Sequence, residues 1–247
     1  MKNLMKYEFR NTWGTKLIIL GLTVFLEVVF LAALFLNKED ITGLSAMLLT
    51  LLAIFGIMFV GIQSVITLHR DMNTKQSYML FMTPNSSYKI LGSKMLENGL
   101  SLIAAGVFFY ALGFLDIVLL LDRYGELDQL WKLFRQIMES FNAELELNAR
   151  SIAIFLVSMV SSWFCTLSTA YFADIVSTAL LNGKRMNGLM SFALFIVLSL
   201  VTGWIQRQIP GSVGVTNMLL IEAGISLILS IVMYYFSARL MERSLSV

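Results

Sequence analysis

Six long runs of apolar residues constrain this 247-residue chain more than any other feature of its sequence. A helix needs about 20 mostly apolar residues to cross a bilayer, and it satisfies its own backbone hydrogen bonds in lipid. The runs are continuously apolar, whereas the strands of a membrane barrel alternate between lipid-facing and lumen-facing residues. The sequence therefore predicts an all-α membrane protein with one transmembrane domain, residues 1–247, and six transmembrane helices. These are expected at residues 17–36, 44–68, 100–121, 151–176, 188–205 and 219–236.

The composition agrees with this class and excludes several others. Charged residues make up 14% of the chain, whereas soluble domains carry about 25%. The net charge of +2 is too small to indicate a nucleic-acid partner. The single cysteine, Cys165, excludes an intrachain disulfide and a multi-cysteine zinc site. His69, the one histidine, has no acidic or cysteine cluster at ligand spacing, so we expect no metal, no cofactor and no histidine-dependent catalytic triad.

The distribution of basic residues predicts the orientation, because Lys and Arg favour the cytoplasmic side of a membrane. With the N-terminus inside the cell, the inner segments hold twelve of the 18 Lys and Arg residues: Lys2, Lys6, Arg10, Lys16, Arg70, Lys75, Lys89, Lys94, Lys184, Arg185, Arg239 and Arg243. The other six lie outside, four of them in the loop 122–150. We therefore expect a multi-pass protein of the plasma membrane with both termini in the cytoplasm.

Two segments outside the spans are amphipathic. In residues 1–13, apolar side chains share one helical face and basic side chains recur every four residues on another. This pattern predicts a helix at the headgroup level, and a solvated basic tail is the alternative. In the extracellular segment 122–150, apolar residues also follow helical spacing. That segment is interpreted either as a packing element on the outer surface or as a substrate gate.

The polar segment 69–95, HRDMNTKQSYMLFMTPNSSYKILGSKM, separates the second and third spans. Tyr78, Phe81 and Met82 would share one face of a short helical turn, which Pro84 would end. Aromatic and methionine side chains surrounded by charges are typical of a protein interface. The alternative is an ordinary loop whose apolar residues dip into lipid.

This layout resembles the permease of a type-2 ATP-binding cassette (ABC) transporter, which has six helices per subunit, an N-terminal interfacial helix and a cytoplasmic coupling helix between spans two and three. The resemblance in layout covers the whole chain, but the matching motif is confined to the segment 69–95. There "HRD", "KQSYMLFMTP" and "NSSYKILGSKM" follow the family pattern. The residues at its characteristic places are Arg70, Asp71, Thr83, Pro84 and Lys94.

The resemblance implies an exporter permease energised by a separate ATPase subunit. It also implies a second permease subunit, identical or related, and membrane lipids as surroundings. Tyr78, Phe81 and Met82 are then expected to insert into the ATPase, with polar contacts at the rim from Arg70, Asp71 and Lys75. The sequence contains no G-x-x-x-x-G-K-[ST] phosphate loop, so we expect no enzymatic activity in this chain and ATP hydrolysis in the partner.

A few polar residues fall within the apolar runs. A charge at the bilayer centre costs about 2.5–3.5 kcal/mol, so Glu27 should face the helix bundle or a water-filled cavity. It is a candidate for the translocation path or a cation site, and equally for a structural hydrogen bond between helices. Gln63 is a second candidate for the path. Asp116 is expected near the outer membrane interface. The small polar residues of the fourth span, Ser158 to Thr169, favour a packing seam over a pore lining.

Two other functions remain compatible with the sequence. One is a secondary transporter driven by an ion gradient, with Glu27 as the coupling group, although the inverted repeats and broken helices common in such proteins are not evident. The other is a non-transporting sensor or anchor subunit. The sequence does not specify a substrate.

Overall fold

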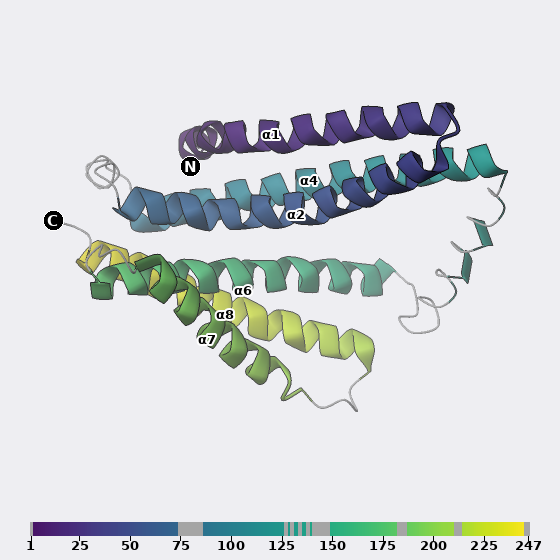
Figure 1. Ribbon diagram of the computed structural model, residues 1–247. Coiled ribbons are helices and arrows are strands. Elements are labelled where there is room, and N and C mark those ends of the chain that lie inside the picture. The colour runs from purple at the N-terminus through teal and green to yellow at the C-terminus, as the bar shows by residue number, and fades with distance from the viewer. Residues whose placement is uncertain are drawn as a thin grey trace. The chain divides into compact units, whose positions relative to one another are not determined.

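The computed structural model describes residues 2–73, 86–125, 149–181, 187–209 and 214–244, together with isolated helical positions between 128 and 139. These residues form six helices (Figure 1). Their bounds are α1 Lys2–Phe35, α2 Glu39–Asn73, α4 Ser87–Tyr124, α6 Ala149–Leu181, α7 Asn187–Gln206 and α8 Val215–Ser244. All six are long and apolar enough to cross a membrane, so the predicted all-α, multi-pass architecture is confirmed.

All six helices are longer than the apolar runs that predict them. The longest, α4, has 38 residues. At 1.5 Å per residue this is about 57 Å, nearly twice the hydrocarbon thickness of a bilayer. The extra turns are polar, and they carry most of the interhelical hydrogen bonds described below. Long helices thus provide both the spans and the polar parts that project beyond them.

The N-terminal segment 1–13 does not form a helix separate from the first span. From Lys2 onward it is the first part of α1, which continues without a break to Phe35. Helical periodicity persists through this region and no proline interrupts it. The expected boundary between an interfacial helix and the first span is therefore absent.

One compact unit comprises residues Met1–Ser64 and Leu96–Ile137, that is, α1, most of α2 and the later part of α4. Its apolar core forms around Phe30, Leu34 and Leu49. Gly56 of α2 allows close packing, because a Cβ atom there would lie 3.2 Å from Ile19 of α1 and 3.3 Å from Phe109 of α4. Small residues at such positions let membrane helices approach one another.

The two turns of this unit are fixed by residues in the left-handed conformation. Asn37, with φ 55°, lies between α1 and α2, and Gly125, with φ 70°, ends α4. Both conformations are favoured by these residue types. The Arg123 guanidinium donates hydrogen bonds to the Asn37 side-chain oxygen at 2.7 and 3.1 Å. This contact joins the α1–α2 turn to the end of α4.

The second compact unit comprises residues Val65–Met95 and Met138–Val247, that is, the end of α2, the start of α4, and α6 to α8. Its core is a cluster of nine buried residues: Leu68, Met72, Leu91, Met95, Leu167, Tyr171, Ile175, Ala238 and Met241. Within it, Ser168 of α6 and Ser230 of α8 are hydrogen-bonded at 2.9 Å. The Thr169 hydroxyl donates to the sulfur of Met233 at 3.1 Å. The small polar residues of the fourth span therefore do contribute to helix packing.

Several predictions concern residues outside those that the structure describes. These include Lys75, Tyr78, Phe81 and Met82 of the 69–95 segment, and most of the amphipathic segment 122–150.

Candidate functional site

The two helices that lead into and out of the segment 74–85 are joined by a buried ion pair. Asp71 lies in the last turn of α2, and Lys94 lies two turns into α4. The Lys94 ammonium donates to the Asp71 carboxylate at 2.7 Å, and the side chains of Lys94 and Asp71 are 1% and 10% exposed. Removing one partner of a buried ion pair leaves an uncompensated charge, which costs about 3–5 kcal/mol. We call this pair, together with the His69–Asp174 and Tyr234–Tyr88 contacts, the loop base.

Two further contacts extend the loop base to the other helices of its unit. Nδ1 of His69, in α2, lies 2.6 Å from Oδ1 of Asp174 in α6. Asp174 is almost completely buried, whereas His69 is partly exposed. The Tyr234 hydroxyl of α8 donates to the Tyr88 carbonyl in the first turn of α4. The start of α4 and the end of α2 are therefore both held to the α6–α8 part of their unit.

Within the loop base, the observed contacts differ from the roles that the sequence predicts for some of these residues. Arg70 is exposed at the end of α2. Asp71 was expected at the rim of that partner, but its buried carboxylate is instead bonded to Lys94 within the chain. Lys94 precedes the third apolar run in the sequence and lies within α4. The structure assigns it an interhelical ion pair.

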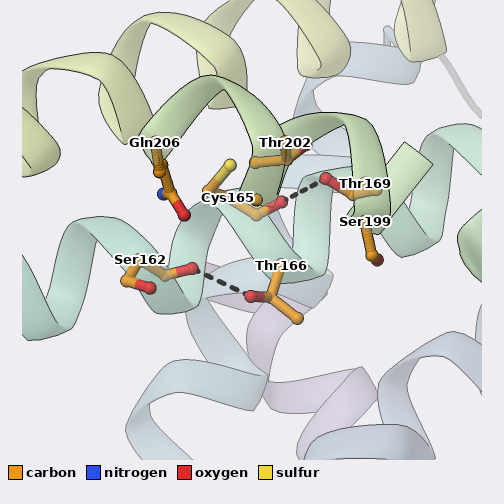
Figure 2. Close-up of a pocket in the computed structure, with 8 residues that line it drawn as sticks. Ser162, Cys165, Thr166, Thr169, Ser199, Thr202 and Gln206 are labelled. Carbon is orange, nitrogen blue, oxygen red and sulfur yellow. Dashed lines mark hydrogen bonds between the residues drawn. The ribbon is translucent and has the colours of Figure 1, made fainter. Parts of the chain in front are cut away.

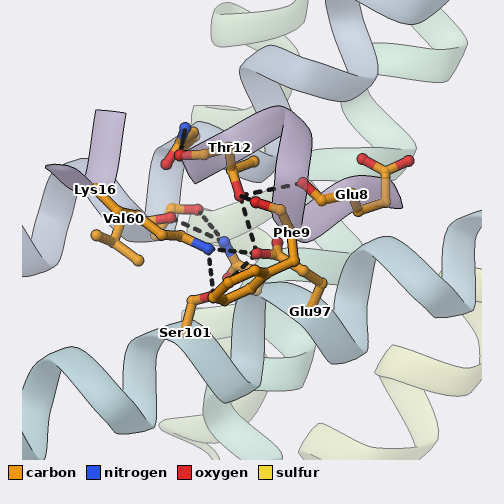
Figure 3. Close-up of polar contacts among 10 residues, drawn as sticks. Glu8, Phe9, Thr12, Lys16, Val60, Glu97 and Ser101 are labelled. Carbon is orange, nitrogen blue, oxygen red and sulfur yellow. Dashed lines mark hydrogen bonds and ion pairs between the residues drawn. The ribbon is translucent and has the colours of Figure 1, made fainter. Parts of the chain in front are cut away.

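A second polar cluster, in the other unit, joins the first turns of α1 to α2 and α4 (Figure 3). Its centre is the buried carboxylate of Glu97 in α4. Thr12 of α1 donates to Glu97 Oε1 at 3.0 Å, and Ser101 of α4 donates to the same atom at 2.9 Å. The Lys16 ammonium of α1 also donates to this oxygen and, at 2.6 Å, to Ser101. Glu97 thus accepts three hydrogen bonds from two helices.

Two amides complete the second cluster. Gln63 of α2 donates to the Thr12 carbonyl at 3.2 Å, and Asn98 of α4 donates to the Val60 carbonyl at 2.9 Å. Both amide side chains are buried. The Lys16 ammonium also lies 4.4 Å from the centre of the Phe9 ring, at cation–π distance. Gln63, a sequence candidate for the translocation path, therefore lies in a helix-packing cluster.

The sequence analysis missed Glu97, although a signal for it is present. Lys94, Glu97, Asn98 and Ser101 follow i, i+3, i+4, i+7 spacing, so they form one polar stripe along α4. Thr12 and Lys16 are likewise four residues apart on α1. Polar stripes on two apolar helices are expected to face each other, because lipid offers them no hydrogen-bonding partner.

Glu27 has an acidic partner that the sequence analysis also missed. Its carboxyl group lies close enough to that of Asp116 in α4 for the two groups to interact. Each residue lies eight positions before the end of its helix. Asp116 is therefore a neighbour of Glu27 within the same compact unit.

These clusters define what the described residues can do chemically. They contain no group of three or more His, Cys, Asp or Glu side chains able to hold a metal ion. They provide fixed ion pairs between helices and one pair of neighbouring carboxyl groups. Comparison with protein-family models, with curated proteins and with solved structures found no match to this chain. The function is therefore argued from these contacts and from the sequence pattern.

Proposed function

We propose that this chain is the permease subunit of an ABC exporter, energised by a separate ATPase subunit that docks on the segment between α2 and α4. Two such permease subunits, identical or related, would enclose the path in the plasma membrane. Both termini and the docking segment would face the cytoplasm. The observation that carries the proposal is the buried Asp71–Lys94 pair at the loop base.

The ion pair bears on how force would pass from the ATPase to the spans. An ATPase that moves a loop does work on the spans only when the loop is firmly attached to them. The Asp71–Lys94 pair joins the helices on either side of the segment, and His69–Asp174 continues the connection to α6. A displacement of the segment would then move α2, α4 and α6 together instead of bending one helix end.

The sequence also supports a permease that depends on a separate ATPase. The six spans and their extensions occupy most of the chain, and no phosphate-binding loop is present. Tyr78, Phe81 and Met82 would supply the apolar contacts with the ATPase. Arg70 and Lys75 would supply polar contacts at the rim, while Asp71 would act through Lys94.

The test is co-purification of an ATPase from the native membrane. We expect the affinity-tagged chain to elute with a nucleotide-binding protein and with ATPase activity. Tyr78→Ala combined with Phe81→Ala should remove both. The matched control is Tyr110→Ala with Phe114→Ala, which truncates exposed aromatic residues in the apolar middle of α4 and should leave both unchanged. Full ATPase recovery with the first variant would refute docking at this segment.

The Glu27–Asp116 pair supports a second candidate, a transporter driven by an ion gradient. Two neighbouring carboxyl groups inside a span are a suitable coupling group for proton movement. The two candidates differ in reconstituted vesicles without any ATPase. Cargo movement that requires a proton gradient, and that Glu27→Gln abolishes, would favour this second function. Movement only with the ATPase and ATP would favour the first.

A further inference from the structure

Three exposed basic residues of the second unit have no acidic partner among the residues that the structure describes. They are Lys89, in the first turn of α4, and Arg239 and Arg243, near the end of α8. The ion pairs of the described residues include none of the three. The surface of this unit therefore carries positive charge that its own described side chains do not neutralise.

Aromatic side chains hold Arg239 beside the start of α4. Its guanidinium donates to the Tyr235 hydroxyl at 3.3 Å and lies 6.0 Å from the centre of the same ring, at cation–π distance. The Tyr235 ring contacts the ring of Tyr88 in α4, with 6.2 Å between the ring centres. The Tyr234 hydroxyl donates to the Tyr88 carbonyl at 2.5 Å. The exposed Arg239 is thus preorganised, so a ligand that binds it loses less side-chain entropy.

The exposed face of α8 changes along its length from apolar to aromatic to basic. Ile228, Val232, Tyr235, Arg239 and Arg243 follow i, i+4, i+7, i+11, i+15 spacing, which places them on one side of the helix. The first three are 64%, 45% and 45% exposed. Helix α8 is a candidate span, and tyrosine is enriched where spans meet the lipid head groups. A phospholipid beside this face would place its acyl chain along Ile228 and Val232 and its head group beside Arg239.

The interior of the second unit is less suited to an anion. The polar cavity between α6 and α7 has no charged side chain among the eight residues that line it (Figure 2). The Thr169 and Thr202 hydroxyls in its lining donate to backbone carbonyls of their own helices, at 2.7 and 2.9 Å. The buried ammonium of Lys94 is paired with Asp71. An anionic group is therefore attracted to the surface cations rather than to the interior.

The charges at the junction of α4 and α8 indicate the class of lipid. A guanidinium binds two phosphate oxygens through parallel N–H donors, and a lysine ammonium adds a point charge. Glu242 is the one acidic residue in the last two turns of α8, so the three cations outnumber it. A zwitterionic head group carries a positive charge of its own, which these cations would repel. The junction therefore favours a head group with a net negative charge.

We propose that the junction of α4 and α8 binds the head group of an anionic phospholipid. The phosphate lies between Arg239 and Lys89, Arg243 adds to the attraction, and an acyl chain lies along the exposed face of α8. This site does not depend on the proposed transport function, because it uses no residue of the docking segment and lipid retention is a property of the chain alone.

Native mass spectrometry of the full chain in detergent tests the proposal by counting bound lipids. Phosphatidylglycerol and phosphatidylcholine with the same acyl chains are compared at equal concentrations. We expect preferential retention of phosphatidylglycerol. Arg239→Gln and Arg243→Gln should each lower its affinity about fivefold, the usual effect of one basic residue beside anionic lipid. Equal affinities of the wild-type chain for the two lipids, or an unchanged affinity in both variants, would overturn the proposal.

Two controls distinguish this site from general surface charge and from a site for free phosphate. Arg207→Gln removes another exposed arginine, three residues after the exposed Trp204 and directly after α7. It should leave the affinity for phosphatidylglycerol unchanged, and a loss equal to that of Arg239→Gln would refute the site. Glycerol phosphate has the phosphate without acyl chains, so it should not displace the lipid at equal concentration. Displacement would show a site for phosphate alone and would refute lipid binding.

Discussion

Lys94 of α4 and Asp71 of α2 form a buried ion pair, 2.7 Å between Nζ and Oδ2, across the base of the segment 74–85. The two residues are 23 positions apart in the sequence. An ion pair in this position holds the two ends of the segment together, whatever binds to it.

Replacing Lys94 with Met should destabilise the protein by about 3–5 kcal/mol, because the Asp71 carboxylate would remain buried without its partner. Asp71→Leu together with Lys94→Met should recover most of that loss, since neither charge then remains. Thermal unfolding of the purified protein in detergent measures the stability of the single and the double variant. Equal losses in the single and double variants would contradict a role for the ion pair in stability.

Replacing Glu97 with Leu should loosen the first turns of α1. The hydrogen bonds from Thr12, Lys16 and Ser101 would lose their common acceptor, and the Lys16 charge would lose its partner. We expect faster amide hydrogen exchange in residues 3–16, with little change in α6 to α8. Glu39→Gln, an exposed acid at the start of α2, is the control. Uniform acceleration in all helices would indicate general unfolding instead.

Gly56→Val should destabilise the protein by about 1–3 kcal/mol, because the new side chain would overlap Ile19 and Phe109. The matched control is Gly21→Val in α1, where a Cβ atom meets nothing within 4 Å. That variant should be close to wild type in thermal stability. If the two variants are equally stable, the close contact at Gly56 does not limit packing.

Glu27→Gln should preserve the fold, since the new amide can donate a hydrogen bond to the neighbouring Asp116 carboxylate. Glu27→Leu should lower stability, because Asp116 would lose its partner among apolar helices. Combining Glu27→Leu with Asp116→Leu should restore stability. A double-mutant cycle by thermal unfolding measures the coupling. A coupling energy of zero would show that the two carboxyl groups do not interact.

The number and type of helices were predictable because apolar runs of membrane length leave few alternatives. The helix ends were less predictable. α1 begins at Lys2 because its amphipathic first turns share the helical periodicity of the span, and a change in composition at residue 14 does not end a helix. The apolar composition of a segment indicates which residues can lie in lipid. The backbone hydrogen bonds of the helix continue beyond those residues.

The pairing of polar residues was not predictable from single segments. Glu27 was recognised as costly in a membrane, but its contact with Asp116 depends on the rotation of α1 against α4. Asp71 was recognised as part of the family pattern, but its burial depends on Lys94, which lies beyond the intervening segment. Glu97 could have been identified from the polar stripe of α4. The residues that bind Glu97 can be identified only from the structure.

The unbroken course of α1 has a practical consequence for measuring motion. Tyr7, which is exposed, and Glu27 belong to the same helix and are about 30 Å apart along its axis. A fluorophore or spin label at position 7 would therefore report on movements of the whole helix, including the part that carries Glu27. Any tilt of α1 could be recorded from a probe at position 7, far along the helix from Glu27.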